Sequence, residues 1–165
     1  MPPPGSYFID RHAAEKAVNL SLPMILEAMK HKEVGESGFL YIVVMDPLLT
    51  PANASFEEAI LYEHAVGDRR KWDADYAGFA YAKARVAWRT GFDGHLVQEL
   101  RPHLLTAKDT VLWGSIVLDG IVVGVSGANP WFDEAFAGTV AMCLRALAKA
   151  GITEERSRHL FLPAK

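Results

Sequence analysis

Apolar residues near the start of the chain recur at intervals of three and four, the spacing of a helix with one buried face. Between residues 10 and 30, Ala14 and Val18 follow this spacing, and Asp10 is placed to cap the start of the helix. Pro23 lies inside the same stretch. Because an interior proline removes a backbone hydrogen bond and crowds the preceding turn, we expect a kink or two shorter helices there.

The next apolar run, residues 39–45, carries β-branched and aromatic residues at odd and even positions alike. A strand of this kind is covered on both faces, so we predict a central strand that ends at Asp46-Pro47. Residues 48–55 have the composition of a loop, and residues 59–64 are predicted as a second strand.

Residues 73–90 predict a further helix. Asp75 lies in its first turn and Arg89 in its last, and each charge matches the helix dipole. Gly91 follows as a residue that readily takes the left-handed conformation at a helix end. A shorter helix is expected over residues 95–100.

Two apolar runs, residues 111–118 and 121–127, flank the dipeptide Asp119-Gly120 and predict a β-hairpin with a two-residue turn. If Leu118 pairs with Ile121, one face of this hairpin is uniformly apolar. On the other face the same register gives two cross-strand pairs, Trp113 with Ser126 and Ser115 with Gly124.

The last part of the chain predicts one more helix. Asn129-Pro130 supplies a cap and a proline in the first turn, and Asp133 and Glu134 lie near the positive end of the dipole. We expect the helix to reach Gly151. Its expected buried stripe consists of Phe132, Phe136, Thr139, Cys143 and Leu147.

The predicted order is helix, strand, strand, helix, short helix, strand, strand, helix. This order is typical of an α+β domain in which helices cover an antiparallel sheet, and it argues against a doubly wound parallel sheet. A chain of 165 residues suits one such domain. We assign residues 10–150 to it, residues 1–9 to a flexible N-terminal segment and residues 151–165 to an exposed C-terminal extension.

Composition narrows the classes of function. Half of the residues are hydrophobic, 22% are charged and the formal net charge is -3, as in a folded protein without the basic surface that binds phosphate backbones. We therefore expect no nucleic-acid partner. A single cysteine, Cys143, excludes an internal disulfide, and no apolar run approaches the ~18 residues of a membrane span. We expect a cytoplasmic protein without a membrane partner.

Lys83 is the most informative charge, because it lies in the middle of the apolar stripe of the helix at residues 73–90, whereas Arg85 and Arg89 point away. An ammonium on the packed side of a helix must reach water, find an anion or lose its proton. Two roles stay open. Lys83 reaches past small alanines to a structural partner, or it contacts a ligand.

Trp113, Ser115, Gly124 and Ser126 share one face of the predicted hairpin. Glycine and serine leave backbone groups accessible and tryptophan offers a stacking surface, so a flat ligand could lie there. Alternatively, the small residues only let a helix approach the sheet closely, which is the preferred interpretation for Gly124. Gly127 then leads into a helix start whose free N–H groups could hold a carboxylate or phosphate.

The six histidines show no metal-binding motif. None belongs to an HExxH sequence or adjoins a cysteine, so we expect no metal site. His64 is considered separately because it ends the second predicted strand beside a charged turn. An imidazole there could act as an acid, a base or an axial ligand, and a surface histidine without function is the alternative.

Two segments are distinctive: Lys83-Ala-Arg-Val-Ala, and Leu118-Asp-Gly-Ile-Val-Val-Gly-Val-Ser-Gly-Ala followed by Phe132-Asp-Glu. They resemble the GlcG/HbpS-like family of heme-degrading or heme-binding domains, which also occurs at the C-terminal end of PduO-type corrinoid adenosyltransferases. Asp46, after its apolar run, is similar to the aspartate that ends the family's first strand. The resemblance covers about residues 10–150 and implies a profilin-like or PAS-like fold, homo-oligomers and heme as one ligand.

The first functional hypothesis is a small-ligand-binding protein of this class. Its pocket would lie between the helix at residues 73–90 and the hairpin at residues 111–127, with heme or another planar anion as the ligand. Lys83 would pair with the anion, Trp113 would stack on the plane, and Ser126 would form hydrogen bonds.

The second hypothesis is a cofactor-independent catabolic enzyme, a lyase, isomerase or hydrolase of a small carboxylated metabolite. Lys83 would serve as anion anchor or base, and His64 as acid or base. A third hypothesis, an interaction protein with no small ligand, would be favoured by a featureless site beside Lys83.

Overall fold

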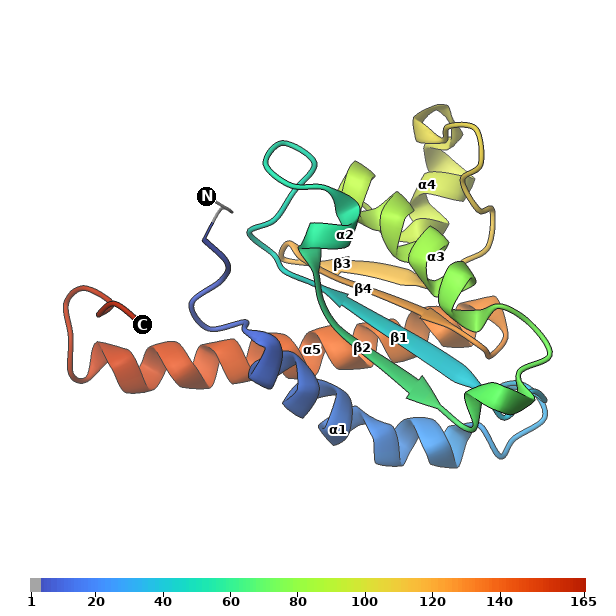
Figure 1. The fold of residues 1–165 in the computed structure, drawn as a ribbon, viewed down its shortest axis with the longest axis horizontal. Helices are drawn as coiled ribbons and strands as arrows, with labels where there is room; N and C mark the ends of the chain where they lie inside the picture. The colour runs from blue at the N-terminus through green and yellow to red at the C-terminus, as the bar shows by residue number, and fades with distance from the viewer. Residues whose placement is uncertain (1–3) are drawn as a thin grey trace.

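Four antiparallel strands form a single sheet in the order β2-β1-β4-β3 (Figure 1). The computed structural model describes residues 4–165. The strands are β1 Leu40–Met45, β2 Ile60–Val66, β3 Ser115–Leu118 and β4 Ile121–Ser126. The helices are α1 Arg11–Ala28, α2 Phe56–Ala59, α3 Tyr76–Thr90, α4 Gly94–Leu100 and α5 Pro130–Arg156, with 3₁₀ turns at Arg69–Lys71 and Pro102–Leu104.

Strand β1 is the predicted central strand. It pairs with β2 on one side and β4 on the other, and all six of its residues are buried. The second predicted strand is also present as β2. The short helix α2, which was not predicted, follows the expected loop and includes residue 59, because Ser55 and Glu58 form a capping box that satisfies its first N–H groups.

The hairpin has the predicted register, with Leu118 paired to Ile121. Asp119 and Gly120 have φ angles of 50° and 82°, the left-handed values that a tight two-residue turn requires. The expectation that the first strand starts at residue 111 was wrong. Gly114, with φ 139°, turns the chain away from the sheet, and β3 begins one residue later. Trp113 therefore does not pair with Ser126.

Helices cover both faces of the sheet (Figure 1). Helices α1 and α5 pack on the face that carries Ile42, Val123 and Val125, and α3 packs on the face that carries Val43 and Val122. The predicted α+β class with an antiparallel sheet is thereby confirmed. Each face has its own hydrophobic cluster, and β1 contributes to both of them.

Helix α1 begins where the sequence places its cap, since the Asp10 side chain accepts a hydrogen bond from Ala13 N at 2.9 Å. Of the two expected outcomes, the break into two shorter helices is wrong, because α1 continues through Pro23 as one helix, and a kink stays a prediction. Pro23 and Asn19 are both exposed. The Asn19 carbonyl, which loses its backbone donor to the proline, can therefore bond to water.

Helix α3 ends at Thr90 as predicted but begins at Tyr76 instead of residue 73, so Asp75 precedes its first turn. Asp75 caps its start by accepting from Gly78 N at 3.0 Å, and Gly91 ends it with φ 76°. The short helix predicted after it is α4, which begins at Gly94.

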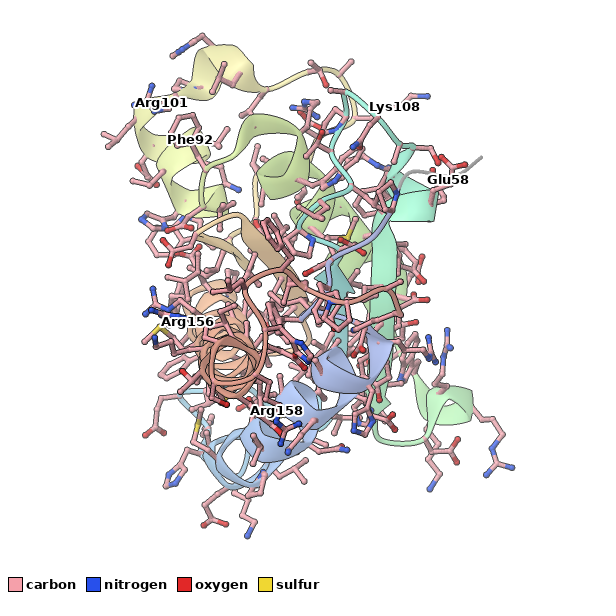
Figure 2. All side chains as sticks on the ribbon, turned by 90° about the vertical axis from the view of Figure 1, so that its left-hand side faces the viewer. Glu58, Phe92, Arg101, Lys108, Arg156 and Arg158 are labelled. Atoms are coloured by element: carbon pink, nitrogen blue, oxygen red, sulfur yellow. The ribbon has the colours of Figure 1, made fainter. Side chains whose placement is uncertain are left out.

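Helix α5 starts at Pro130 as predicted but ends at Arg156 instead of Gly151. Figure 2 looks along this helix, with Arg156 near its C-terminal end. Its buried face is turned relative to the predicted stripe and consists of Asp133, Glu134, Phe136, Ala137, Val140, Ala141 and Leu144. The predicted stripe contained no charged side chain, whereas two carboxylates lie on the buried face.

By length and composition α5 could cross a membrane, with a mean hydropathy of 1.4. Its residues Phe136, Val140 and Leu144 are nevertheless part of the core beneath the sheet. A core helix meets the same criteria, so α5 is compatible with a globular domain.

The two ends of the chain differ in their contacts. In the N-terminal segment, Ser6 N donates to Asp46 Oδ1 at 3.3 Å and Ile9 is 6% exposed. Residues 1–3 lie outside the described residues, and the flexibility of the segment 1–9 remains a prediction. At the other end, Leu160 and Phe161 are exposed.

Candidate functional site

Lys83 is buried inside the protein, as its position on the apolar stripe of α3 predicts, with 2% of its side chain exposed. Its Nζ donates to Asp133 Oδ2 at 2.7 Å, to Val125 O at 3.2 Å and to Ser126 Oγ at 3.3 Å. Three acceptors satisfy the three donors of an ammonium group. Lys83 thus has an internal counterion and already binds Ser126, the serine with which it was expected to share a ligand.

Asp133 completes this arrangement from the first turn of α5. Its Oδ1 accepts from Ala128 N at 2.8 Å, and the side chain is 1% exposed. Burial disfavours the ionised carboxyl and raises its pKa to about 6, although Lys83 and the backbone N–H groups act in the opposite direction. Lys83 and Asp133 therefore join α3 to α5 through a buried ion pair.

Gly124 has the packing role that its small size suggests. A Cβ atom at this position would lie 2.7 Å from Ala84 Cβ and 2.9 Å from Ala80 O of α3. Any side chain would push the helix off the sheet, and no ligand fits between them there. Gly127 has φ 144°, a conformation that favours glycine, and its backbone leads into α5.

Trp113 lies outside the sheet and packs on His95, with ring centroids 5.2 Å apart. It lines a hollow of about 320 Å³, which we call the Trp113 groove, formed by Glu99, Val111, Leu112, Trp113, Pro130 and Trp131. Val111 is 72% exposed and Trp131 is 58% exposed. The ligand-binding role of Trp113 stays a prediction, and residues of α4 and α5 join it in lining the hollow.

Ser115 is the first residue of β3 and is 1% exposed. Its hydroxyl lies against Gly94, where an added Cβ would be 2.7 Å away, and it has no hydrogen-bond partner among residues 4–165. A buried hydroxyl without a partner is unusual in a folded protein.

His64 is not close to Lys83. It lies on β2 opposite Ile42, on the sheet face covered by α1 and α5, whereas Lys83 belongs to the helix on the other face. Its Nδ1 is 3.4 Å from the Tyr62 hydroxyl, and burial lowers its pKa. The structure therefore does not bring together the lysine and histidine of the enzyme hypothesis.

A cluster that sequence reasoning missed lies beside Trp113. We call it the His95 cluster, and it consists of Asp93 before α4, His95 in the first turn of α4 and Glu134 in the first turn of α5. One nitrogen or oxygen atom from each lies within 4.8 Å of the others. His95 Nδ1 is hydrogen-bonded to Glu134 Oε1.

Glu134 is buried, and burial raises its pKa against the lowering effect of His95. Its Oε2 atom has no partner among the described residues. The pair Asp133-Glu134 was interpreted as a favourable charge at a helix start. No local pattern could connect Glu134 with Asp93 and His95, because Glu134 is 39 positions away from His95 in the sequence.

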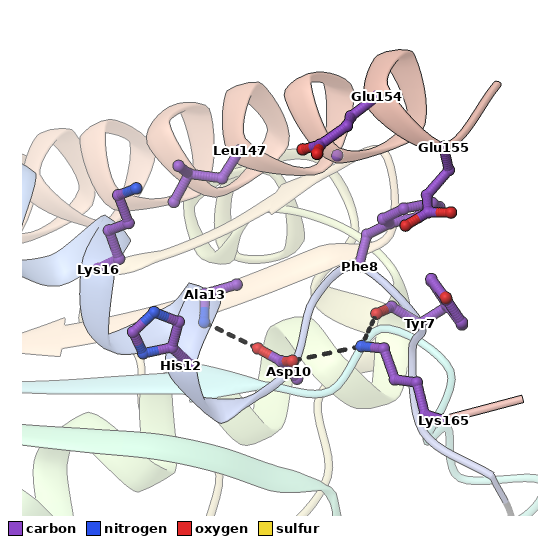
Figure 3. Close-up of a pocket in the computed structure, with 11 residues that line it drawn as sticks. Tyr7, Phe8, Asp10, His12, Ala13, Lys16, Leu147, Glu154, Glu155 and Lys165 are labelled. Carbon is purple, nitrogen blue, oxygen red and sulfur yellow. Dashed lines mark hydrogen bonds and ion pairs between the residues drawn. The ribbon is translucent and has the colours of Figure 1, made fainter. Parts of the chain in front are cut away.

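A second hollow, of about 310 Å³, lies where the two ends of the chain meet (Figure 3). Lys165 Nζ donates there to the carbonyl of Tyr7 and lies 3.3 Å from Asp10 Oδ2. Asp10 also caps α1 through Ala13. The carboxylate and the terminal lysine thus already bind each other.

An antiparallel four-stranded sheet with helices on both faces defines the class of this protein as an α+β domain. No family model matches the sequence, and no curated protein matches it. Among solved structures, the chain is similar to the crystal structure of Klebsiella pneumoniae protein ORFY, family-model DUF336. The identity is 16%, the match covers 88% of this chain and 97% of that chain, and the TM-score is 0.57. At this identity the likeness shows a shared fold.

Proposed function

We propose that the protein is a GlcG-like, small-ligand-binding protein and that a planar ligand lies in the Trp113 groove. The fold shared with a DUF336 protein supports the family, because DUF336 is the GlcG-like family. The observation that carries the ligand proposal is the groove itself, in which Trp113 and Trp131 offer two aromatic surfaces beside exposed aliphatic side chains. Aromatic faces bind flat molecules by stacking.

The chemistry of the groove restricts its ligand. Lys83, the expected anchor for an anion, is neutralised by Asp133, and the groove is lined by Glu99. Stacking and apolar contact, rather than pairing with a negative charge, therefore dominate binding in this proposal. Heme remains a suitable probe because it is large, flat and largely apolar.

The test is a titration of the purified protein with hemin, followed by Soret absorbance and tryptophan fluorescence. Trp131→Ala and Trp113→Ala should each weaken a saturable one-to-one complex by about tenfold or more, as loss of one aromatic contact predicts. Phe79→Ala is the matched control, since it removes an exposed aromatic ring outside the groove. Non-saturable binding, or equal weakening by all three changes, would contradict the proposal.

An enzymatic role is a second candidate, favoured by one observation. Asp133 and Glu134 are adjacent buried carboxyls with raised pKa values, as is common for acid and base groups. In this second candidate function, His95 replaces His64 as the acid or base. Turnover of small carboxylated metabolites, followed by NMR, should then disappear in His95→Ala and persist in His64→Ala. Persistence in both variants would remove the assignment.

We also propose that the protein self-associates. The support is the exposed apolar tail, in which Leu160 is 98% and Phe161 88% exposed. Light scattering after size exclusion should give a multiple of the 18.2 kDa chain mass, and deletion of residues 157–165 should reduce it. A monomer at micromolar concentration would contradict this proposal.

A further inference from the structure

We infer that the His95 cluster binds a divalent transition-metal ion. The inference does not depend on the ligand of the Trp113 groove, because the three side chains converge without it. Asp93 and His95 are two positions apart at the start of α4, and Glu134 reaches them from the first turn of α5. Their ligand atoms lie within 4.8 Å of one another. Small side-chain movements can bring such atoms to the roughly 2.0–2.2 Å that such metals require from N and O ligands.

The unused bonding capacity of buried atoms is the second observation. Glu134 is 8% exposed, yet its Oε2 has no hydrogen-bond partner within residues 4–165. Leaving a buried carboxylate oxygen without a donor is unfavourable, and a bound cation would satisfy it. The Ser115 hydroxyl is also buried and has no partner among the described residues. It lies against Gly94, the residue between Asp93 and His95 in the sequence. Such a hydroxyl can hydrogen-bond a metal-bound water or ligand oxygen.

The donor set defines the class of metal. One imidazole nitrogen and two carboxylates suit Mn²⁺, Fe²⁺, Co²⁺ or Zn²⁺, whereas Ca²⁺ prefers oxygen ligands alone and Cu⁺ prefers sulfur. Three protein ligands leave positions for water or a substrate, as in catalytic metal sites. His95 is 31% exposed, so an ion can enter from the surface.

The surroundings hold the ligands in place. Asp93 Oδ1 accepts from Val117 N at 2.7 Å, which fixes the carboxylate against β3. Trp113 packs on the imidazole ring of His95 and restricts its orientation. Fixed ligands raise metal affinity because less freedom is lost on binding.

The experiment uses the full chain after treatment with a chelator. Co²⁺ is added while d–d absorption is recorded, and Zn²⁺ and Mn²⁺ binding is measured by calorimetry. We expect one ion per chain, and binding weakened by at least about tenfold in His95→Ala and in Asp93→Asn. Circular dichroism checks that each variant is folded. Glu134→Gln, which keeps the side-chain shape, provides a further variant if either of these unfolds.

His159→Ala is the matched control, because His159 and Glu155 form another histidine–glutamate pair on an exposed helix end, with Nε2 and Oε2 3.9 Å apart. It should leave the bound Co²⁺ spectrum unchanged. The inference is overturned if the wild-type chain binds none of the three ions at millimolar concentration. It is also overturned if folded His95→Ala, Asp93→Asn and Glu134→Gln bind as the wild type does, or if His159→Ala removes the signal instead. Hemin binding by the metal-free chain tests the groove separately.

Discussion

Asp133 and Glu134 are consecutive residues in the first turn of α5, and both are buried, yet their surroundings differ. Asp133 binds Lys83 and Ala128 N through its two oxygens. Glu134 binds His95 through one oxygen, and the other has no partner among the described residues. We call the first pair closed, because both carboxylate oxygens are bonded and it joins two helices, and the second pair open, because one of its oxygens is unused. Both carboxylates are buried, and we propose a metal ligand only at the one whose bonding capacity is unused.

The closed pair should be the more sensitive of the two. Asp133→Ala removes the counterion of Lys83 and leaves the part-buried N–H of Ala128 without its acceptor. We expect a loss of about 3–5 kcal/mol in the free energy of unfolding, measured by urea denaturation. Asp119→Ala breaks the exposed pair with Arg145 and should cost less than about 1 kcal/mol. Similar losses in Asp133→Ala and Asp119→Ala would mean that the buried pair is no more important for stability than an exposed one.

Replacing both members of the closed pair should have a different result. Lys83→Met combined with Asp133→Leu removes the two buried charges together, so its stability near pH 7 should exceed that of Asp133→Ala, although the Ala128 N–H still loses its acceptor. The raised pKa of Asp133 gives the comparison of the double variant with the wild type a pH dependence. Between pH 3.8 and about 6, folded Asp133 holds its proton more tightly than the unfolded chain does.

The contribution of Asp133 to stability is therefore highest at acidic pH and falls as the pH rises through this window. An increase in pKa from 3.8 to about 6 corresponds to as much as about 3 kcal/mol. The double variant lacks this dependence, so its stability relative to the wild type should increase from pH 4 to pH 7. Urea unfolding curves of both proteins at pH 4 and pH 7 measure this difference in stability. A relative stability that stays constant or decreases over this range would show that burial does not raise this pKa.

Features that depend on neighbouring residues could be predicted from the sequence, whereas contacts between distant residues could not. The hairpin turn, the cap of α1, the glycine that ends α3 and the burial of Lys83 depend on residues within a few positions of one another, and they were predicted correctly. The partner of Lys83 is 50 positions away and had been assigned to the helix dipole. The His95 cluster also needs the starts of α4 and α5, two segments far apart in sequence that only the tertiary fold brings together. Patterns along a chain report local preference and burial, but not which distant groups meet.

At the open pair, Glu134→Gln should cost less than Asp133→Ala. The amide keeps the shape of the side chain, and His95, which is 31% exposed, can exchange its lost acceptor for water. We expect a loss of about 1 kcal/mol by urea denaturation. A loss as large as that of Asp133→Ala would mean that the open pair is as important for the fold as the closed one.

Ser115→Ala should have the smallest effect on stability. The Ser115 hydroxyl is buried without a partner in residues 4–165, so its removal eliminates a desolvated polar group and breaks no hydrogen bond. We expect a change within about 0.5 kcal/mol, or a small gain, on urea unfolding. Ser126→Ala is the control, because it removes an acceptor of Lys83 Nζ and should cost about 1 kcal/mol. A larger loss for Ser115→Ala than for Ser126→Ala would show that the Ser115 hydroxyl is bonded to an ordered water. Its bonding capacity would then not be unused.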